Sequence, residues 1–289
     1  MAFDPILYVA LLAGFLAGRW SRVRSPWVPR ATLATVVVLV GLLGTALSGE
    51  PTEALLTTIP VAIGFVLLIL GSTAAIYLLL ERKAPDSRES AVRPEPSKTF
   101  PLSLALLLAL LAGFGAGHFI TLPTASAITD ALYVLLALVG FDLTLRWERL
   151  SRLWLPIAAA VGAALVSALV FAVVAHQSLA VSLATSLAFG WYTLAGPLVA
   201  ARAGAVLGLL AFLTNFLREN LTMLLSPYVG RRLRGAGLAA LGGATSMDTT
   251  LYFVTRFGEA EAASLSLASG LLLTLAASLI LPAVLALPL

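Results

Sequence analysis

The chain has 289 residues, of which 60% are hydrophobic and 11% charged, and its mean hydropathy is +1.01. A soluble domain is about half apolar and a quarter charged, so this composition indicates an integral membrane protein instead. The net charge of +4 does not indicate a nucleic-acid partner, because the arginines lie in short clusters between apolar runs. The absence of cysteine excludes disulfides, thiolate metal sites and cysteine nucleophiles.

Continuous apolar runs of about 20 residues match the length of helix that crosses a bilayer. The first run resembles a signal-peptide core, but basic residues follow it rather than precede it, so we interpret it as a retained span. The hydrophilic segment 81–99 is predicted to be a solvated linker, not a domain. Segments 180–200 and 237–256 are shorter, rich in glycine and more polar. The predicted full spans are 4–18, 31–48, 56–80, 101–120, 126–145, 154–175, 204–229 and 261–286.

The loops between the first six spans alternate in basic charge. Loops at one end hold all of the lysines and arginines, whereas loops at the other end hold Glu50 and Glu53, His118, or His176. The positive-inside rule therefore places the N-terminus outside a cell (inner) membrane. The basic residues are Arg19, Arg22, Arg24 and Arg30, then Arg82, Lys83, Arg88, Arg93 and Lys98, then Arg146, Arg149 and Arg152.

An internal repeat is present in the first half of the chain. The pattern Ala-Leu-Leu-Ala-Gly at 10–14 recurs at 109–113, and Leu-Val-Gly at 39–41 recurs at 138–140 with the same offset. Chance similarity among alanine, leucine and glycine is the alternative. Three spans per repeat would set the two copies, 1–80 and 101–175, inverted in the membrane, as in many secondary transporters.

The second half, 176–289, poses a topological problem. If 180–200 were a full span, the basic residues Arg231, Arg232 and Arg234 would lie outside, against the positive-inside rule. If 180–200 and 237–256 are instead re-entrant hairpins from opposite faces, every basic cluster lies inside and the C-terminus outside. The expected fold is therefore an all-α integral membrane protein of about eight transmembrane helices plus two oppositely oriented re-entrant hairpins. Ten full spans remain the alternative.

Irregular backbone at membrane depth is tolerated where it is buried or lines a cavity, so the hairpin tips are the expected binding site. In the first hairpin, Gly190 and the pair Gly196-Pro197 are predicted to break the helix and free backbone groups for binding. The alternative for the aromatic pair is an anchor at the lipid headgroups. The candidate residues of this tip are Trp191, Tyr192, Thr193 and Gly196.

In the second hairpin a carboxylate, Asp248, lies among hydroxyl residues. Insertion scales put a central aspartate at about +2.5–3.5 kcal/mol, so its presence suggests that it binds a cation, a proton or a substrate amine. A shallow aspartate that caps a short helix is the alternative. The other candidates here are Thr245, Ser246 and Thr249.

Span 204–229 carries a polar stripe, since the spacings of Asn215, Arg218, Glu219, Thr222 and Ser226 place them on one helical face. Such a stripe must face protein or a water-filled path. Both a structural ion pair and direct substrate contact are consistent with Arg218 and Glu219. A secondary candidate is Asp142, for which a local pair with Arg146 at the membrane interface is the simpler interpretation.

These residues resemble the lysine exporter LysO family. The family pattern is approximately G-W-Y-S-L-S-G, then R-E, then G-A-T-S-M-D-x-T-L-P, and its counterparts here are 190–196, 218–219 and 243–252. Two departures from this pattern matter, namely Ala195 in place of a serine and Tyr252 in place of a proline. Either could change which substrate is preferred.

The resemblance implies a secondary active transporter, not an enzyme, that exports L-lysine or related basic amino acids. Asp248 and Glu219 could receive the ammonium groups, and Arg218, hairpin backbone amides or Thr193 could receive the α-carboxylate. Export of a cation against the usual membrane potential requires coupling, which implies antiport with H+ or Na+ and no other cofactor. The alternative is a sodium-coupled carboxylate or amino-acid carrier. An oligomer is left open.

Overall fold

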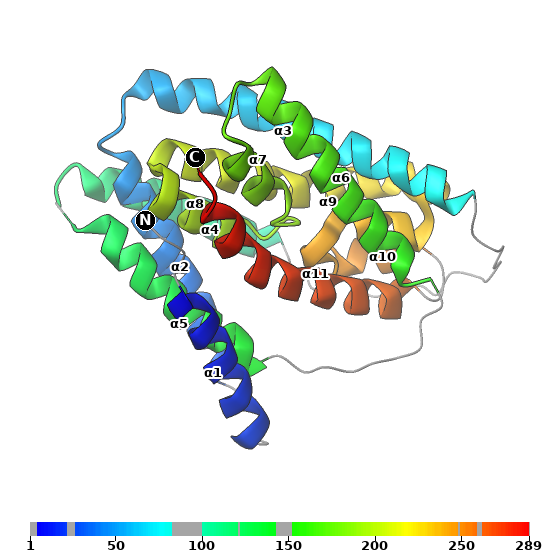
Figure 1. The fold of residues 1–289 in the computed structure, drawn as a ribbon, viewed down its shortest axis with the longest axis horizontal. Coiled ribbons are helices and arrows are strands. Elements are labelled where there is room, and N and C mark those ends of the chain that lie inside the picture. The colour runs from blue at the N-terminus through cyan, green and yellow to red at the C-terminus, as the bar shows by residue number, and fades with distance from the viewer. Residues whose placement is uncertain are drawn as a thin grey trace.

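The computed structural model describes residues 5–21, 27–82, 100–120, 122–142, 152–247, 249–258 and 262–288. These residues form helices and turns, with no strand in the described part, so the predicted all-α class is confirmed there (Figure 1). Asp248 and most of the predicted linker lie outside the described residues. The helices are α1 Pro5–Ser21, α2 Val28–Leu47, α3 Thr52–Glu81, α4 Phe100–Gly117, α5 Thr124–Asp142, α6 Trp154–Val174, α7 Leu179–Ser186, α8 Tyr192–Ala203, α9 Ala205–Gly242, the 3-10 helix η1 Gly243–Met247, α10 Leu251–Phe257 and α11 Ala262–Leu285.

Four helices in the described part are long and apolar enough to cross a membrane. They match four of the predicted spans, and α1, α4, α5 and the first part of α9 lie at the other four. The apolar side chains on their outer faces are exposed, as expected where the solvent is lipid. The four segments are Arg30–Leu47, Thr52–Glu81, Trp154–Val174 and Ala262–Leu285.

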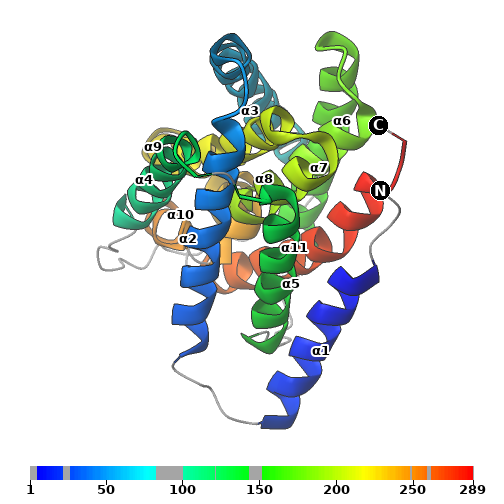
Figure 2. The same ribbon diagram turned by 90° about the vertical axis from the view of Figure 1, so that its left-hand side faces the viewer.

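The first six helices pack through small residues. α1 lies along α5 (Figure 2). α4 lies along α2, α2 also contacts α5, and α3 contacts α6. In the first pair, Gly14 faces the backbone carbonyl of Ala137; in the second, Gly113 faces that of Gly41. A side chain at either glycine would collide with the neighbouring helix backbone. The glycine pairs of the repeated sequence therefore act as packing surfaces, as small residues do in membrane helices.

The second half of the chain contains two interrupted helical units. The first unit is α7, a short break at 187–191, and α8. The second unit begins within α9, because Arg234 has φ 55° and ψ −170° and separates a long first part from the arm 235–242. This arm is followed by η1 and α10. The positions of both units match those predicted for the hairpins.

One predicted break is wrong. Gly196 and Pro197 lie inside α8, and the break of this unit occurs at Phe189 and Gly190, which have φ values of 53° and 94°. A Cβ atom on Gly196 would lie 2.8 Å from the Cβ of Phe212, so this glycine lets α8 pack closely on α9. We infer that packing on α9 outweighs the loss of one helical hydrogen bond at the proline.

Candidate functional site

The breaks of the two interrupted units contact each other directly. The backbone N–H of Ala244 donates to the carbonyl of Phe189 at 2.8 Å. A Cβ atom on Gly190 would lie 3.2 Å from the Gly242 carbonyl oxygen, and one on Gly243 would collide with the Phe189 carbonyl. Gly243 also has φ 65°, a conformation that favours glycine. The sequence predicts a binding site at the tips of both units, and the structure places the two tips in direct contact, which forms one junction.

Asn215 on α9 holds the first break in place. Its Oδ1 accepts the backbone N–H of Gly190 at 2.8 Å, and its Nδ2 donates to the carbonyls of Thr185 at 2.8 Å and Ala211 at 2.9 Å. The side chain is fully buried. Two of these bonds reach the break at Gly190 and the last turn of α7, and the third, to Ala211, lies within α9 itself. Asn215 therefore fixes the conformation of the first tip relative to α9.

Arg218, one turn further along α9, holds the second unit. Its Nε donates to the carbonyl of Leu241 at 2.9 Å and its Nη2 to the carbonyl of Ala240 at 3.0 Å. These carbonyls lie at the end of the arm 235–242, where a helix leaves acceptors unsatisfied and carries partial negative charge. The buried guanidinium thus binds backbone oxygens, a role not anticipated from the sequence.

The predicted stripe on α9 is buried along its length. Glu219 is 1% exposed, and the hydroxyl of Ser226 donates to the carbonyl of Thr222 at 2.6 Å. Stripe residues thus face the protein interior, as the spacing predicts. Three threonine hydroxyls on α7 and α9 are buried with no hydrogen-bond partner among the described residues, and two of them were missed from the sequence. They are Thr185, Thr214 and Thr222.

The second tip is lined by hydroxyl groups. Thr245 Oγ1 donates to the Gly242 carbonyl at 3.0 Å, and Ser246 Oγ donates to the carbonyls of Gly243 at 2.7 Å and Ser266 at 3.1 Å. Thr249 is half-buried beside them. The predicted carboxylate of this tip, Asp248, lies outside the described residues. These hydroxyls stabilise the backbone conformation of the second tip, because they donate to the carbonyls of Gly242 and Gly243 within it.

The remaining candidates lie in different surroundings. Tyr192 is buried edge-on between Phe212 and Phe216, with ring centroids 5.4 Å apart in each pair, which does not fit an anchor among lipid headgroups. Trp191 is half-buried and Thr193 is buried. Asp142 ends α5, and its side chain lies outside the described part. The α8 residue in place of the family serine, Ala195, lies in an apolar cluster.

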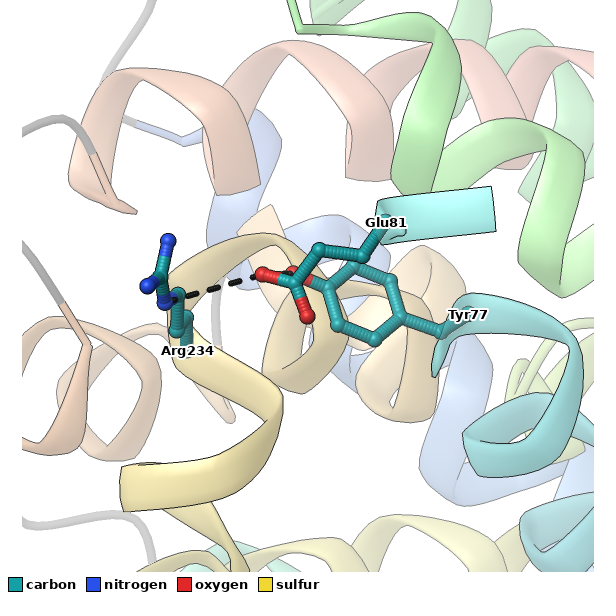
Figure 3. Close-up of polar contacts among 3 residues, drawn as sticks. All are labelled: Tyr77, Glu81 and Arg234. Carbon is teal, nitrogen blue, oxygen red and sulfur yellow. Dashed lines mark hydrogen bonds and ion pairs between the residues drawn. The ribbon is translucent and has the colours of Figure 1, made fainter. Parts of the chain in front are cut away.

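A further polar cluster joins the two halves of the chain (Figure 3). Glu81, at the end of α3, accepts a hydrogen bond from the hydroxyl of Tyr77 at 3.0 Å and lies 3.6 Å from Nε of Arg234. Gly237 of the arm packs against the Tyr77 ring. The contact was not predicted, because the only signal in sequence is opposite charge at two span ends far apart along the chain.

Taken together, the apolar helices and the buried polar junction at two helix breaks define a membrane protein with an internal site of the kind used by transporters. The family model described as lysine exporter LysO matches residues 107–285, which include both breaks and the α9 stripe. The chain therefore belongs to the LysO family, and the resemblance predicted from the sequence is confirmed. Membership also agrees with the prediction of a transporter, not an enzyme.

Two curated relatives match over shorter stretches. One is the lysine exporter LysO of Escherichia coli strain K12, which is 39% identical over 30% of this chain and 29% of its own length. The other is a putative lysine exporter of Haemophilus influenzae, 29% identical over 32% of this chain and 47% of its own length. The matched segments thus span less than half of either relative. No solved structure matches the chain.

Proposed function

We propose that this protein is a secondary active transporter that exports L-lysine, or a related basic amino acid, from the cytoplasm. The observation that carries the proposal is the junction of two helix breaks against the buried residues Asn215, Arg218 and Glu219. A charged pair inside an apolar helix is costly to bury and is retained where it binds a substrate or an ion. Family membership and the names of the two relatives support lysine as the substrate.

We propose eight spans and two re-entrant units, with both termini outside. In this arrangement the end of α3 and the α9 kink lie at the inner face, which agrees with the contact between Glu81 and Arg234. The ends of α8 and α11 lie together at the outer face, which agrees with donation from Nε of Arg202 to the carbonyl of Leu285 at 2.9 Å. Ten full spans would separate each of these pairs by the thickness of the membrane.

We also propose that 1–80 and 101–175 are inverted repeats. In a two-fold relation between α1–α3 and α4–α6, α1 corresponds to α4, α2 to α5 and α3 to α6. The contact of α1 with α5 would then be equivalent to the contact of α4 with α2. The corresponding helices α2 and α5, and α3 and α6, would pack against each other across the axis. These four packing pairs occur, and glycines of the repeated sequence lie in the two equivalent ones. The pairing supports the repeat interpretation over chance similarity.

In the proposed mechanism the acidic residues receive the cationic groups of lysine. Glu219 is buried and follows Arg218 on α9, and Asp248 follows η1 directly in the sequence. Outward movement of a cation opposes the usual membrane potential, so export is coupled to inward movement of H+ or Na+. Occupation of one carboxylate alternately by substrate and by the coupling ion would link the two movements.

The test is efflux of labelled lysine from proteoliposomes containing the purified protein. We expect export against a lysine gradient only when an opposing proton or sodium gradient is imposed, and the active gradient identifies the coupling ion. Glutamate is the comparison substrate, because a buried arginine also suits a sodium-coupled carboxylate carrier. Transport of glutamate in place of lysine would establish that alternative.

A further inference from the structure

Arg218 retains one nitrogen that the protein does not use. Its Nε and Nη2 donate to the arm carbonyls, but Nη1 has no hydrogen-bond partner among the described residues, and the side chain is 0% exposed. Leaving a buried charged donor unsatisfied costs the full desolvation penalty of that group. A protein group of this kind indicates a ligand that supplies the missing acceptor.

Three backbone amides at the contact between the tips are already engaged. Gly190 donates to Asn215, Trp191 to the carbonyl of Ala188 at 2.9 Å, and Ala244 to the carbonyl of Phe189 at 2.8 Å. A substrate carboxylate could bind these amides only by breaking bonds that hold the junction together. Arg218 Nη1 carries a positive charge as well as unused protons, so it is the better binding site for an anion.

Buried hydroxyl groups lie on both sides of Arg218 along α9, and one more lies on α7. Thr214 and Thr222 lie one turn before and one turn after Arg218 on α9, and Thr185 lies where Asn215 ties α7 to α9. The three hydroxyls are fully buried and have no hydrogen-bond partner in the described part of the chain. A guanidinium edge with nearby hydroxyls suits the two oxygens of a carboxylate, which accept two parallel hydrogen bonds.

We infer that Arg218 Nη1 binds the α-carboxylate of the substrate, so that the transporter accepts α-amino acids and rejects the corresponding amines. The inference rests on the proposed transport function and specifies its substrate class. Cadaverine is lysine without the carboxylate and keeps both amines. Discrimination between the two compounds therefore measures the carboxylate contact alone.

The experiment measures thermal stabilisation of the purified full-length protein by L-lysine, L-lysinamide and cadaverine. A charge-assisted hydrogen bond contributes roughly 1.5–3 kcal/mol, so the half-maximal concentration should be about 10-fold or more higher for the two compounds without a carboxylate. Equal half-maximal concentrations for lysine and cadaverine would overturn the inference. This comparison uses the unmodified protein and does not depend on whether a variant folds.

Arg218→Lys then assigns the discrimination to this residue, because lysine keeps the charge but cannot hold two carbonyls and a carboxylate together. The ratio of cadaverine to lysine half-maximal concentrations should fall towards one. Arg202→Lys is the matched control, since Arg202 also donates to a backbone carbonyl but lies away from the junction. An unchanged ratio in Arg218→Lys would show that another group binds the carboxylate.

The outcomes separate this inference from the proposed function. One outcome is stabilisation by another α-amino acid, but not by lysine or by the decarboxylated form of that amino acid. This outcome would support the carboxylate contact and reject lysine as the exported substrate. Equal response to lysine and cadaverine would keep a transporter of basic compounds and reject the contact. No response to any carboxylate-bearing amino acid would reject both.

Discussion

Single side chains connect the two helix breaks to α9. Asn215 bonds to the first break and Arg218 to the arm of the second, so a span of α9 less than one turn long positions both tips. The amide of Asn215 uses both its oxygen and its nitrogen in these contacts, which makes it hard to replace. We therefore expect the stability of the site to depend on the specific hydrogen bonds of these two side chains, so that another polar residue would not replace either of them.

Asn215→Ala should lower both the melting temperature and the transport rate. Its removal leaves a buried backbone N–H and two carbonyls without that side chain, a loss of roughly 2–4 kcal/mol. Asn220→Ala is the control, because Asn220 is half-buried and bonds only to the carbonyl of Phe216 within the same helix among the described contacts. Differential scanning fluorimetry compares the variants. Similar melting temperatures would contradict a clamping role for Asn215.

Glu219→Gln should reduce lysine efflux about 10-fold or more, whereas Glu53→Gln should leave it nearly unchanged. Glu219 is 1% exposed and next to Arg218 on α9, and Glu53 is an exposed residue in the first turn of α3. Efflux from vesicles with equal protein content measures the difference. Equal effects would show that burial of the carboxylate does not determine function.

Asp248→Asn should also reduce efflux about 10-fold or more, because the amide keeps the size of the side chain and removes its charge. The protein should still accumulate in the membrane, since a neutral amide is easier to bury than a carboxylate. Asp248→Glu should retain part of the activity with a shifted pH profile. Wild-type efflux in Asp248→Asn would identify Asp248 as a helix cap.

At the scale of elements, the two interrupted units meet because glycine occupies the contact. Gly243 combines a positive φ with close approach to the Phe189 carbonyl and to Nη2 of Arg218. Gly204, between α8 and α9, has a positive φ of 97°, but a Cβ atom added there would meet no atom of another group within 4 Å. A substitution at Gly204 therefore tests the effect of backbone conformation alone, whereas one at Gly243 tests this effect together with the contact between the tips.

Gly243→Ala should abolish transport and destabilise the protein, whereas Gly204→Ala should impose only the backbone strain of about 1–3 kcal/mol. The added methyl group at position 243 must push the two tips apart. Transport per folded protein, with folding judged by size-exclusion chromatography, distinguishes the two effects. A Gly243→Ala protein that transports at the rate of Gly204→Ala would show that tip contact is dispensable.

For the whole molecule, two contacts test the proposed topology. One joins Glu81 to Arg234 and the other joins Arg202 to Leu285, and in each pair the proposed topology places both residues on the same face of the membrane. The absence of native cysteine makes single-cysteine labelling direct. Arg232 is a suitable position because it is exposed, whereas neighbouring Leu233 is buried.

In intact cells, Arg232→Cys should resist an impermeant thiol reagent and react only after the membrane is permeabilised. His118→Cys, at an exposed position predicted to lie outside, should react without permeabilisation and serves as the control. The expected pattern follows from the positive-inside rule. Labelling of position 232 from outside would support ten full spans.

The sequence alone determined the class of the protein, the positions of the two interrupted units and the polar stripe on α9. These features are local, because span length, glycine position and helical period are properties of one segment. Tertiary structure decided that the tips touch, that Asn215 and Arg218 each hold one of them, and that Gly196 packs a helix rather than ending it. It also brought Glu81 to Arg234. These results depend on contacts between residues far apart along the chain, which hydropathy and motif spacing do not encode.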